Sequence, residues 1–262
     1  MRPVIALLTD FGTVDHYAGT MKGVILGICP DVTLVDITHD IPPHDVMTGA
    51  LELAAAYRYF PAGTIFVAVV DPGVGSARRG VAADTGDYRF VAPDNGVLTM
   101  VLRETPAKKI VELTERRYAR PTVSRTFEGR DRFAPAAAWI AKGTQFAALG
   151  RPAADIQKLD IPLASADADA IHGRVLRVDR FGNLVTNIER KAVERLGQSS
   201  AITIDANGQR IARLVATYAE LPADGVGALF GSTDHLELAA PSSSAAERLG
   251  LGRGAAVTVS RG

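Results

Sequence analysis

The sequence is poor in cysteine, in long apolar runs and in excess charge of either sign. Its single cysteine, Cys29, excludes an intrachain disulfide and favours a reducing compartment, so we expect a cytoplasmic protein. The 29 basic residues balance the 29 acidic ones, so no net charge attracts nucleic acid or an anionic membrane. The apolar runs are much shorter than a membrane span, and no signal peptide is predicted. We therefore expect neither nucleic acid nor a membrane as a partner.

Sequence motifs for metals and nucleotide cofactors are also missing. No GxxxxGK[ST] phosphate loop occurs, and Arg78 stands where the third glycine of a dinucleotide-binding motif belongs. The five histidines form no HExxH motif and have no cysteine partners, which argues against a zinc site. We expect no metal and no cofactor, and a small molecule as the ligand.

The first part of the chain alternates short apolar segments with helical patterns. Its 262 residues suffice for one large domain or two smaller ones. Alternating strands and helices over residues 1–165 predict an α/β domain with a central, mostly parallel sheet. The predicted strands are 4–8, 33–36, 64–70, 80–83, 88–91 and 109–113, and the predicted helices are 17–28, 45–59 and 131–141.

The pattern of alternating strands and helices ends at a segment rich in Ala, Asp, Ser and Pro at 159–171, which we interpret as a linker. Short strands follow, and Asn207-Gly208 is a strong signal for a hairpin turn. Residues 171–262 therefore predict a smaller β domain. Its predicted strands are 172–179, 184–188, 201–204, 227–230, 236–239 and 255–260.

Each of the first three predicted strands ends in an aspartate: Asp10, Asp36 and Asp71. Three carboxylates at one edge of a parallel sheet form a polar mouth, which is where such sheets bind ligands. Aspartate is also a common turn and capping residue, and a turn with a surface ion pair is the alternative explanation of the Asp71 segment. We interpret Asp10, with Phe11 beside it, and Asp71 as functional, and Asp36 as structural.

Three further segments combine polar and aromatic side chains. Residues 126–131 open the predicted helix at 131–141, and local capping and pairing explain Arg130 and Asp131 more easily than they explain Glu128. Residues 178–187 offer an aromatic ring and two carboxamides that suit a purine, although a β-turn would give the same residues. Residues 230–237 place hydroxyls and a carboxylate around a short strand.

In this order, these segments resemble the S-adenosyl-L-methionine hydrolases that release adenosine, relatives of the fluorinating and chlorinating enzymes that use the same substrate. The resemblance covers nearly the whole chain. It implies an N-terminal α/β domain, a C-terminal β-barrel-like domain and a homotrimer whose substrate lies between the N-domain of one subunit and the C-domain of its neighbour. It depends on Thr9-Asp10-Phe11-Gly12, Asp71-Pro72-Gly73-Val74-Gly75 with Arg78-Arg79, Ala92-Pro93-Asp94-Asn95-Gly96, Thr126-Phe127 with Gly129-Arg130-Asp131, Phe181-Gly182-Asn183 with Thr186-Asn187, and Leu236-Glu237.

The resemblance also implies roles for single residues. The family's catalytic set is an aspartate, an arginine seven residues later and a histidine; Asp71 and Arg78 match, whereas Glu128 stands at the histidine position. We assign the third catalytic role to Glu128 and contacts with the substrate to a larger set. That set is Asp10, Phe11 and Asp71 around the nucleoside, Phe181 and Asn183 at the adenine, Asp179 and Ser232 at the methionine end, and Glu237 as an additional contact.

The implied reaction is attack of water or hydroxide on the ribose C5′. Three alternatives remain: halogenation of the same substrate, a non-catalytic sensor that binds S-adenosyl-L-methionine or adenosine, and a generic nucleoside-handling α/β enzyme. Glu128 disfavours halogenation, because a dehydrated halide needs a pocket without negative charge. The loss of the family's histidine is the feature that favours a sensor.

Overall fold

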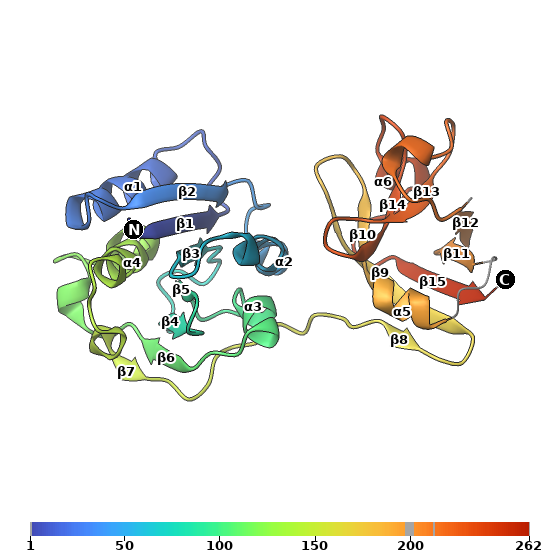
Figure 1. Ribbon diagram of the computed structural model, residues 1–262. Helices are drawn as coiled ribbons and strands as arrows, with labels where there is room; N and C mark the ends of the chain where they lie inside the picture. Colours follow the sequence, from blue (N-terminus) through green and yellow to red (C-terminus); the bar gives the residue numbers. More distant parts are fainter. Residues whose placement is uncertain (1, 197–201, 212, 262) are drawn as a thin grey trace. The chain divides into compact units, whose positions relative to one another are not determined.

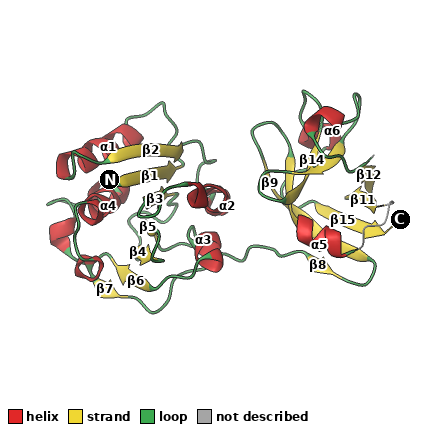
Figure 2. Ribbon diagram, viewed as in Figure 1, coloured by secondary structure: helices red, strands yellow, loops and turns green. Residues whose placement is uncertain are grey.

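The computed structural model describes residues 2–196, 202–211 and 213–261. The chain divides into two units, Met1–Asp160 and Ile161–Gly262 (Figure 1). Figure 2 shows helices and strands alternating in the first unit and strands dominating the second. The predicted α/β domain followed by a barrel-like β domain is thereby confirmed.

The first strand, β1 (Val4–Thr9), is buried on both faces because helices cover both sides of its sheet. Side chains alternate between the faces of a strand, so Ile5 and Leu7 belong to one hydrophobic cluster and Ala6 and Leu8 to another. Helices α1 (Tyr17–Ile28) and α4 (Ala134–Ala141) contribute to the first cluster. Helices α2 (Val46–Ala56) and α3 (Thr99–Glu104) contribute to the second.

The sheet of the first unit has seven strands in the order β2-β1-β3-β5-β4-β6-β7. It is parallel from β2 to β5 and antiparallel beyond. The other strands are β2 (Thr33–Thr38), β3 (Ile65–Val69), β4 (Gly80–Asp84), β5 (Arg89–Pro93), β6 (Lys109–Glu112) and β7 (Arg151–Pro152). Short helical turns lie at η1 (Tyr57–Tyr59), η2 (Arg116–Tyr118) and η4 (Phe146–Leu149).

The strand order changes direction at β1, which has β2 on one side and β3 on the other. Their connecting helices, α1 and α2, belong to clusters on opposite faces. Such a switch point leaves a crevice beyond the carboxyl ends of the two central strands. Asp10 directly follows β1, and Asp71 follows β3 after Val70, so both aspartates lie at this crevice.

The helix predicted at 131–141 starts differently in the structure. Residues Gly129–Phe133 form a π-helical turn, η3, and α4 begins only at Ala134. The Asp131 carboxylate is fully buried and accepts a hydrogen bond from the backbone N–H of Ser124 at 2.9 Å. This inward-facing carboxylate ties the wide turn to the preceding loop, and such turns are frequent at functional sites.

The second unit is an antiparallel sheet that curls into a nearly closed barrel around its own hydrophobic core. Its strand order is β12-β11-β15-β9-β10-β14-β13, with β8 paired to β9. Asn207 and Gly208, with φ of 51° and 85°, form the predicted hairpin turn; residue 201 of the strand predicted before it lies outside the described residues. The elements are β8 (Ser165–Ala166), β9 (Ala170–Val178), β10 (Leu184–Glu189), α5 (Arg190–Arg195), β11 (Ile202–Ala206), β12 (Gln209–Ile211), η5 (Tyr218–Glu220), β13 (Gly227–Phe230), β14 (His235–Ala239), α6 (Ala245–Leu249) and β15 (Ala256–Arg261).

Candidate active site

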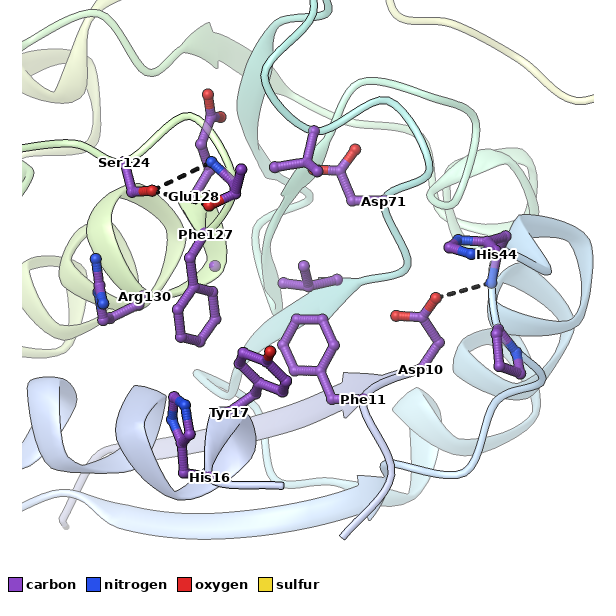
Figure 3. A pocket seen from close by; sticks show the side chains of 15 residues that line it. Asp10, Phe11, His16, Tyr17, His44, Asp71, Ser124, Phe127, Glu128 and Arg130 are labelled. Carbon is purple, nitrogen blue, oxygen red and sulfur yellow. Dashed lines mark hydrogen bonds between the residues drawn. The ribbon is translucent and has the colours of Figure 1, made fainter. Parts of the chain in front are cut away.

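A cavity of about 540 Å³ opens at the switch point of the first unit (Figure 3). It brings together four residues predicted from the sequence: Asp10, Phe11, Asp71 and Glu128. The remaining lining residues come from the start of α1 and the loop before it, from the loop after β2, from the end of β3 and the loop after it, and from the segment before α4. They are His16, Tyr17, Pro43, His44, Val69, Val74, Ser124, Thr126, Phe127, Gly129 and Arg130.

The Arg78 guanidinium joins two carboxylates at the edge of this cavity. Its Nε donates to Asp71 Oδ1 at 2.8 Å, and its Nη2 donates to Asp71 Oδ2. Its Nη1 donates to Glu128 Oε2 at 2.9 Å. The three side chains are 9% (Arg78), 5% (Asp71) and 12% (Glu128) exposed, so this network is largely shielded from water. Such charge-assisted hydrogen bonds are stronger than neutral ones, and they hold the three side chains in a defined orientation.

Burial and charge act against each other in this network. Burial raises the pKa of the Asp71 carboxyl above its ordinary value of 3.8; the bonds from Arg78 oppose this rise, and the nearby charges of Glu128 and Asp10 add to it. Burial alone would lower the pKa of the Arg78 guanidinium, but the bonds to Asp71 and Glu128 outweigh this effect. The pKa of Arg78 is therefore raised above its ordinary value. Arg78 is therefore a permanent cation between the two carboxyl groups.

The loop that carries Arg78 packs directly on the segment that carries Glu128. Gly75 has a φ of 77°, and a Cβ atom on it would lie 2.3 Å from the carbonyl oxygen of Arg125. Arg125 in turn donates from Nη2 to the Gly75 carbonyl at 3.2 Å. Only glycine permits this approach, which explains how two distant sequence segments meet at one site.

Asp10 is oriented by the backbone of the loop after β2. Its Oδ2 accepts from the N–H of His44 at 2.9 Å, and Oδ1 accepts no hydrogen bond from the part of the chain that the structure describes. Asp36 does not line the cavity: it accepts from Lys22 Nζ at 2.6 Å and lies 3.0 Å from His39 Nε2. The structure thus supports the contrast between a cavity-facing Asp10 and a structural Asp36.

Three aromatic rings form one wall of the cavity, near one another in Figure 3. Phe11 lies 5.8 Å from Tyr17 and 5.9 Å from Phe127, and Tyr17 lies 5.2 Å from Phe127, measured between ring centroids. The Arg130 guanidinium covers Phe127 at 5.1 Å while pairing with Asp131, as the local alternative anticipated. Tyr17 and the neighbouring histidines were missed from the sequence, although an aromatic residue opening the helix after the Asp10 loop was an available signal.

Asp179, Phe181 and Asn183 lie on the turn between β9 and β10 of the second unit. The carboxylate of Asp179 closes this turn by accepting from the backbone N–H groups of Phe181 at 2.8 Å and Asn183 at 2.9 Å. The Asn183 side chain donates to the same carboxylate at 2.9 Å, and the Phe181 side chain is left 77% exposed. The segment is therefore both a β-turn and the support of an exposed ring.

The two remaining predicted residues also lie in the second unit. Ser232 is exposed on the turn between β13 and β14. Glu237 on β14 is buried and accepts from the Tyr218 hydroxyl at 2.7 Å. Burial, and then this bond, raise the pKa of Tyr218, so the phenol stays protonated and keeps donating.

Within the described ranges, no group of three or more His, Cys, Asp or Glu side chains is arranged to hold a metal ion. No helix among the same residues is long and apolar enough to cross a membrane. The first unit is thus an α/β domain whose switch-point crevice is lined by carboxylates and an aromatic wall, with the buried Arg78 bound to two of those carboxylates.

The sequence comparisons identify the family. Residues 5–150 match the SAM hydroxide adenosyltransferase N-terminal domain, and residues 173–258 match the C-terminal domain of the same family. The chain belongs to this family, which confirms the resemblance drawn from its motifs.

Several relatives span the full chain. A protein of Thermus thermophilus named (R)-S-adenosyl-L-methionine hydrolase is 38% identical over 97% of this chain and 98% of its own. A protein of Nocardia brasiliensis named fluorinase is 32% identical over 100% of this chain and 98% of its own. The crystal structure of an uncharacterized conserved protein from Thermotoga maritima aligns with a TM-score of 0.92 at 31% identity, covering 98% of this chain and 100% of that one.

Proposed function

We propose that this protein is an enzyme that hydrolyses S-adenosyl-L-methionine to adenosine and L-methionine. Curated relatives that carry the hydrolase name at 34% to 39% identity support this reaction. The structural observation that carries the proposal is the Arg78 guanidinium, which binds Asp71 and Glu128 at the carboxyl end of β3. S-adenosyl-L-methionine acts as the substrate, and the proposed reaction uses no further cofactor.

In the proposed reaction, water attacks the ribose C5′ opposite the sulfonium sulfur. A C–O bond forms, the C–S bond breaks, and its electron pair goes to sulfur, so neutral methionine leaves without needing a proton. The protein must therefore align one water molecule and exclude others, rather than supply an acid. A cavity enclosed by an aromatic wall and carboxylates supports that task.

Arg78 and Glu128 act on the attacking water. A nearby cation favours the anionic form of a group, so Arg78 promotes hydroxide character. Glu128 accepts the proton as a general base. Its negative charge opposes a fully formed hydroxide, so water loses its proton to Glu128 as the C–O bond forms.

Asp10, Asp71 and Phe11 hold the nucleoside. The Asp10 oxygen that accepts no hydrogen bond from the described residues is available to a ribose hydroxyl, and Phe11 offers a ring face. Both Asp71 oxygens already accept from Arg78, so we assign Asp71 two tasks: it orients the guanidinium and contacts the sugar through its remaining lone pairs.

From the family resemblance we extend the proposal to a cytoplasmic homotrimer, in which the second unit of one subunit contacts substrate held by the first unit of its neighbour. Phe181 stacks on the adenine and Asn183 bonds it; Asp179 and Ser232 contact the methionine end, and Glu237 adds a further contact. The exposed ring of Phe181 on a braced turn supports this assignment. A monomer in size-exclusion chromatography with light scattering would contradict it, as would failure of mixed Asp71→Asn and Phe181→Ala subunits to regain turnover.

Turnover in ¹⁸O-labelled water tests the hydrolase directly. Purified protein with S-adenosyl-L-methionine should give methionine and adenosine carrying ¹⁸O at O5′, and an Asp71→Asn variant is the inactive control. Tight binding of the substrate without products would instead support the sensor. No binding and no products would reject the proposal.

Halogenation is the second candidate, because fluorinases are among the relatives. Glu128 lies at the cavity with its charge largely shielded from water, which disfavours a dehydrated halide. Adding chloride or fluoride to the same assay should therefore yield no halogenated nucleoside.

A further inference from the structure

Arg132 is a second cation beside Glu128, one that the proposed reaction does not yet use. Its Nε lies 3.5 Å from Glu128 Oε2, the same oxygen that accepts from Arg78 at 2.9 Å. The Nε–H of Arg132 is buried and has no hydrogen-bond partner within the described residues. Its Nη1 donates to the carbonyl of Leu113 at 2.9 Å, which fixes the guanidinium in place. A buried donor without a partner is costly, so its position calls for a physical reason.

The fold makes room for this side chain. A Cβ atom on Gly80, the first residue of β4, would lie 3.0 Å from Arg132 Cδ and 2.8 Å from the ring of Phe133. The same Phe133 ring lies 5.3 Å from the guanidinium carbon of Arg78. The missing Cβ of Gly80 thus leaves room for both Arg132 and the buried Phe133 ring, over which the Arg78 guanidinium lies.

The charges in this network explain why two cations are needed. Asp71 and Glu128 carry two negative charges, and Arg78 alone supplies one positive charge. While Glu128 is bonded to Arg78, part of that guanidinium is occupied and cannot face the attacking water. A second cation, whose buried Nε lies 3.5 Å from Oε2, gives the carboxylate another partner within a small movement.

We propose that Arg132 is a positioning residue that draws the Glu128 carboxylate away from Arg78 during turnover and so frees Arg78 for the nucleophile. This inference rests on the proposed hydrolase function. It makes residues 128 and 132 one functional pair: a glutamate at 128 works as a base because an arginine at 132 balances it, whereas a neutral histidine at 128 would not need that arginine.

Kinetics of three variants test the pair. Arg132→Leu should lower kcat about 10- to 100-fold with KM changed less than about threefold, because positioning rather than binding is lost. Arg132→Lys should recover part of kcat, and Arg116→Leu is the matched control, since Arg116 lines a second cavity with Arg132 but forms no ion pair with Glu128 in the described part of the chain. Equal losses in Arg116→Leu and Arg132→Leu would overturn the proposal.

A double-mutant cycle separates this role from a purely structural one. In a Glu128→His background, Arg132→Leu should have no effect on kcat or should raise it. The melting temperatures of the same four proteins give a readout without turnover, and the two substitutions should be non-additive. If wild-type protein releases no adenosine, the hydrolase proposal fails by itself; additive melting temperatures reject the Glu128–Arg132 pair whether or not turnover is seen.

Discussion

Arg78 and Arg79 are adjacent in the chain, yet their guanidinium groups bind carboxylates with different roles. Arg78 bonds Asp71 at the cavity, with Nε 2.8 Å from Oδ1. Arg79 bonds the buried Asp94 after β5, with Nε 2.8 Å from Oδ2, and Asp94 also accepts from the backbone N–H of Gln157 at 2.7 Å. The first pair belongs to the candidate active site, whereas the second fastens the end of the first unit to its sheet.

This contrast predicts different outcomes for two neighbouring substitutions. Arg78→Gln should lower kcat about 10²- to 10³-fold, because a preorganised charge is removed from the site. Arg79→Gln leaves Asp94 buried without its cation and should cost about 2 kcal/mol of unfolding free energy, with kcat of the folded protein nearly unchanged. Steady-state kinetics and urea denaturation of both variants measure this, and an equal loss of kcat in the two would refute the division.

Replacing Glu128 tests its role as a base. Glu128→Gln keeps the size of the side chain but cannot accept a proton, so we expect kcat to fall about 10²-fold. Glu128→His restores a base and should recover turnover. Unchanged turnover in the glutamine variant would falsify the assignment of a base at this position.

Asp10 and Asp36 offer a matched pair of strand-end aspartates. Asp10→Asn should raise KM about tenfold, because a charge-assisted bond to the sugar is weakened. Asp36→Asn should leave KM unchanged and cost at most about 1 kcal/mol of stability, since Asp36 and Lys22 are 42% and 30% exposed. Substrate-saturation curves and thermal melts distinguish the two, and a rise in KM for Asp36→Asn would argue against its structural role.

The raised pKa of Asp71 sets the acidic limb of the activity profile. Protonated Asp71 cannot accept both bonds from Arg78, so kcat/KM should be low below its pKa and full above it. Burial raises the pKa of Asp71 above 3.8, so the acidic limb of the pH–activity profile should lie above pH 3.8.

The same ionisation lowers stability while it raises activity, because the Asp71 carboxyl binds its proton more tightly in the folded protein than in the unfolded one. Ionisation of Asp71 therefore lowers the unfolding free energy as pH rises from 3.8 through the folded pKa, and Asp71→Asn should lack this slope. Kinetics and denaturation over acidic to neutral pH measure both effects. An acidic limb at or below 3.8 would contradict them.

The close approach at Gly75 predicts that a single methyl group disturbs the site. Gly75→Ala places a Cβ 2.3 Å from the Arg125 carbonyl at a φ of 77°, so the loop must move and Arg78 with it. We expect kcat to fall at least about tenfold. Gly208→Ala is the control: it has a φ of 85° in the hairpin of the second unit but open space around it, and it should lower stability without changing kcat.

Much of the site could be predicted because strand ends are readable from local pattern. Asp10 and Asp71 follow apolar strands, and the topology of a parallel sheet brings such ends together. Tyr17 and His44 could not be assigned in this way, because their place at the cavity depends on the paths of the loops after β1 and β2. Loop paths depend on long-range contacts, such as the bond from the His44 N–H to Asp10, that no local pattern specifies.

The start of α4 shows a different limit. A regular helix was predicted from residue 131, and proline was correctly placed in its first turn. The π-helical turn at Gly129–Phe133 depends on the buried Asp131 carboxylate, whose partners, Ser124 and Arg130, lie in the preceding loop and on the turn itself. Because this turn also brings Arg132 to Glu128, the second cation of the site stayed hidden in the sequence.

The braced turn at Asp179 has a consequence for ligand affinity. The backbone that carries the exposed Phe181 ring is held by hydrogen bonds to one carboxylate, so little backbone entropy is left to lose when a flat molecule covers the ring. Covering one ring face removes apolar area from water and contributes about 1 kcal/mol. An exposed ring on a braced turn binds any planar heterocycle by stacking to a similar extent. Discrimination between bases must therefore come from the polar groups around the ring.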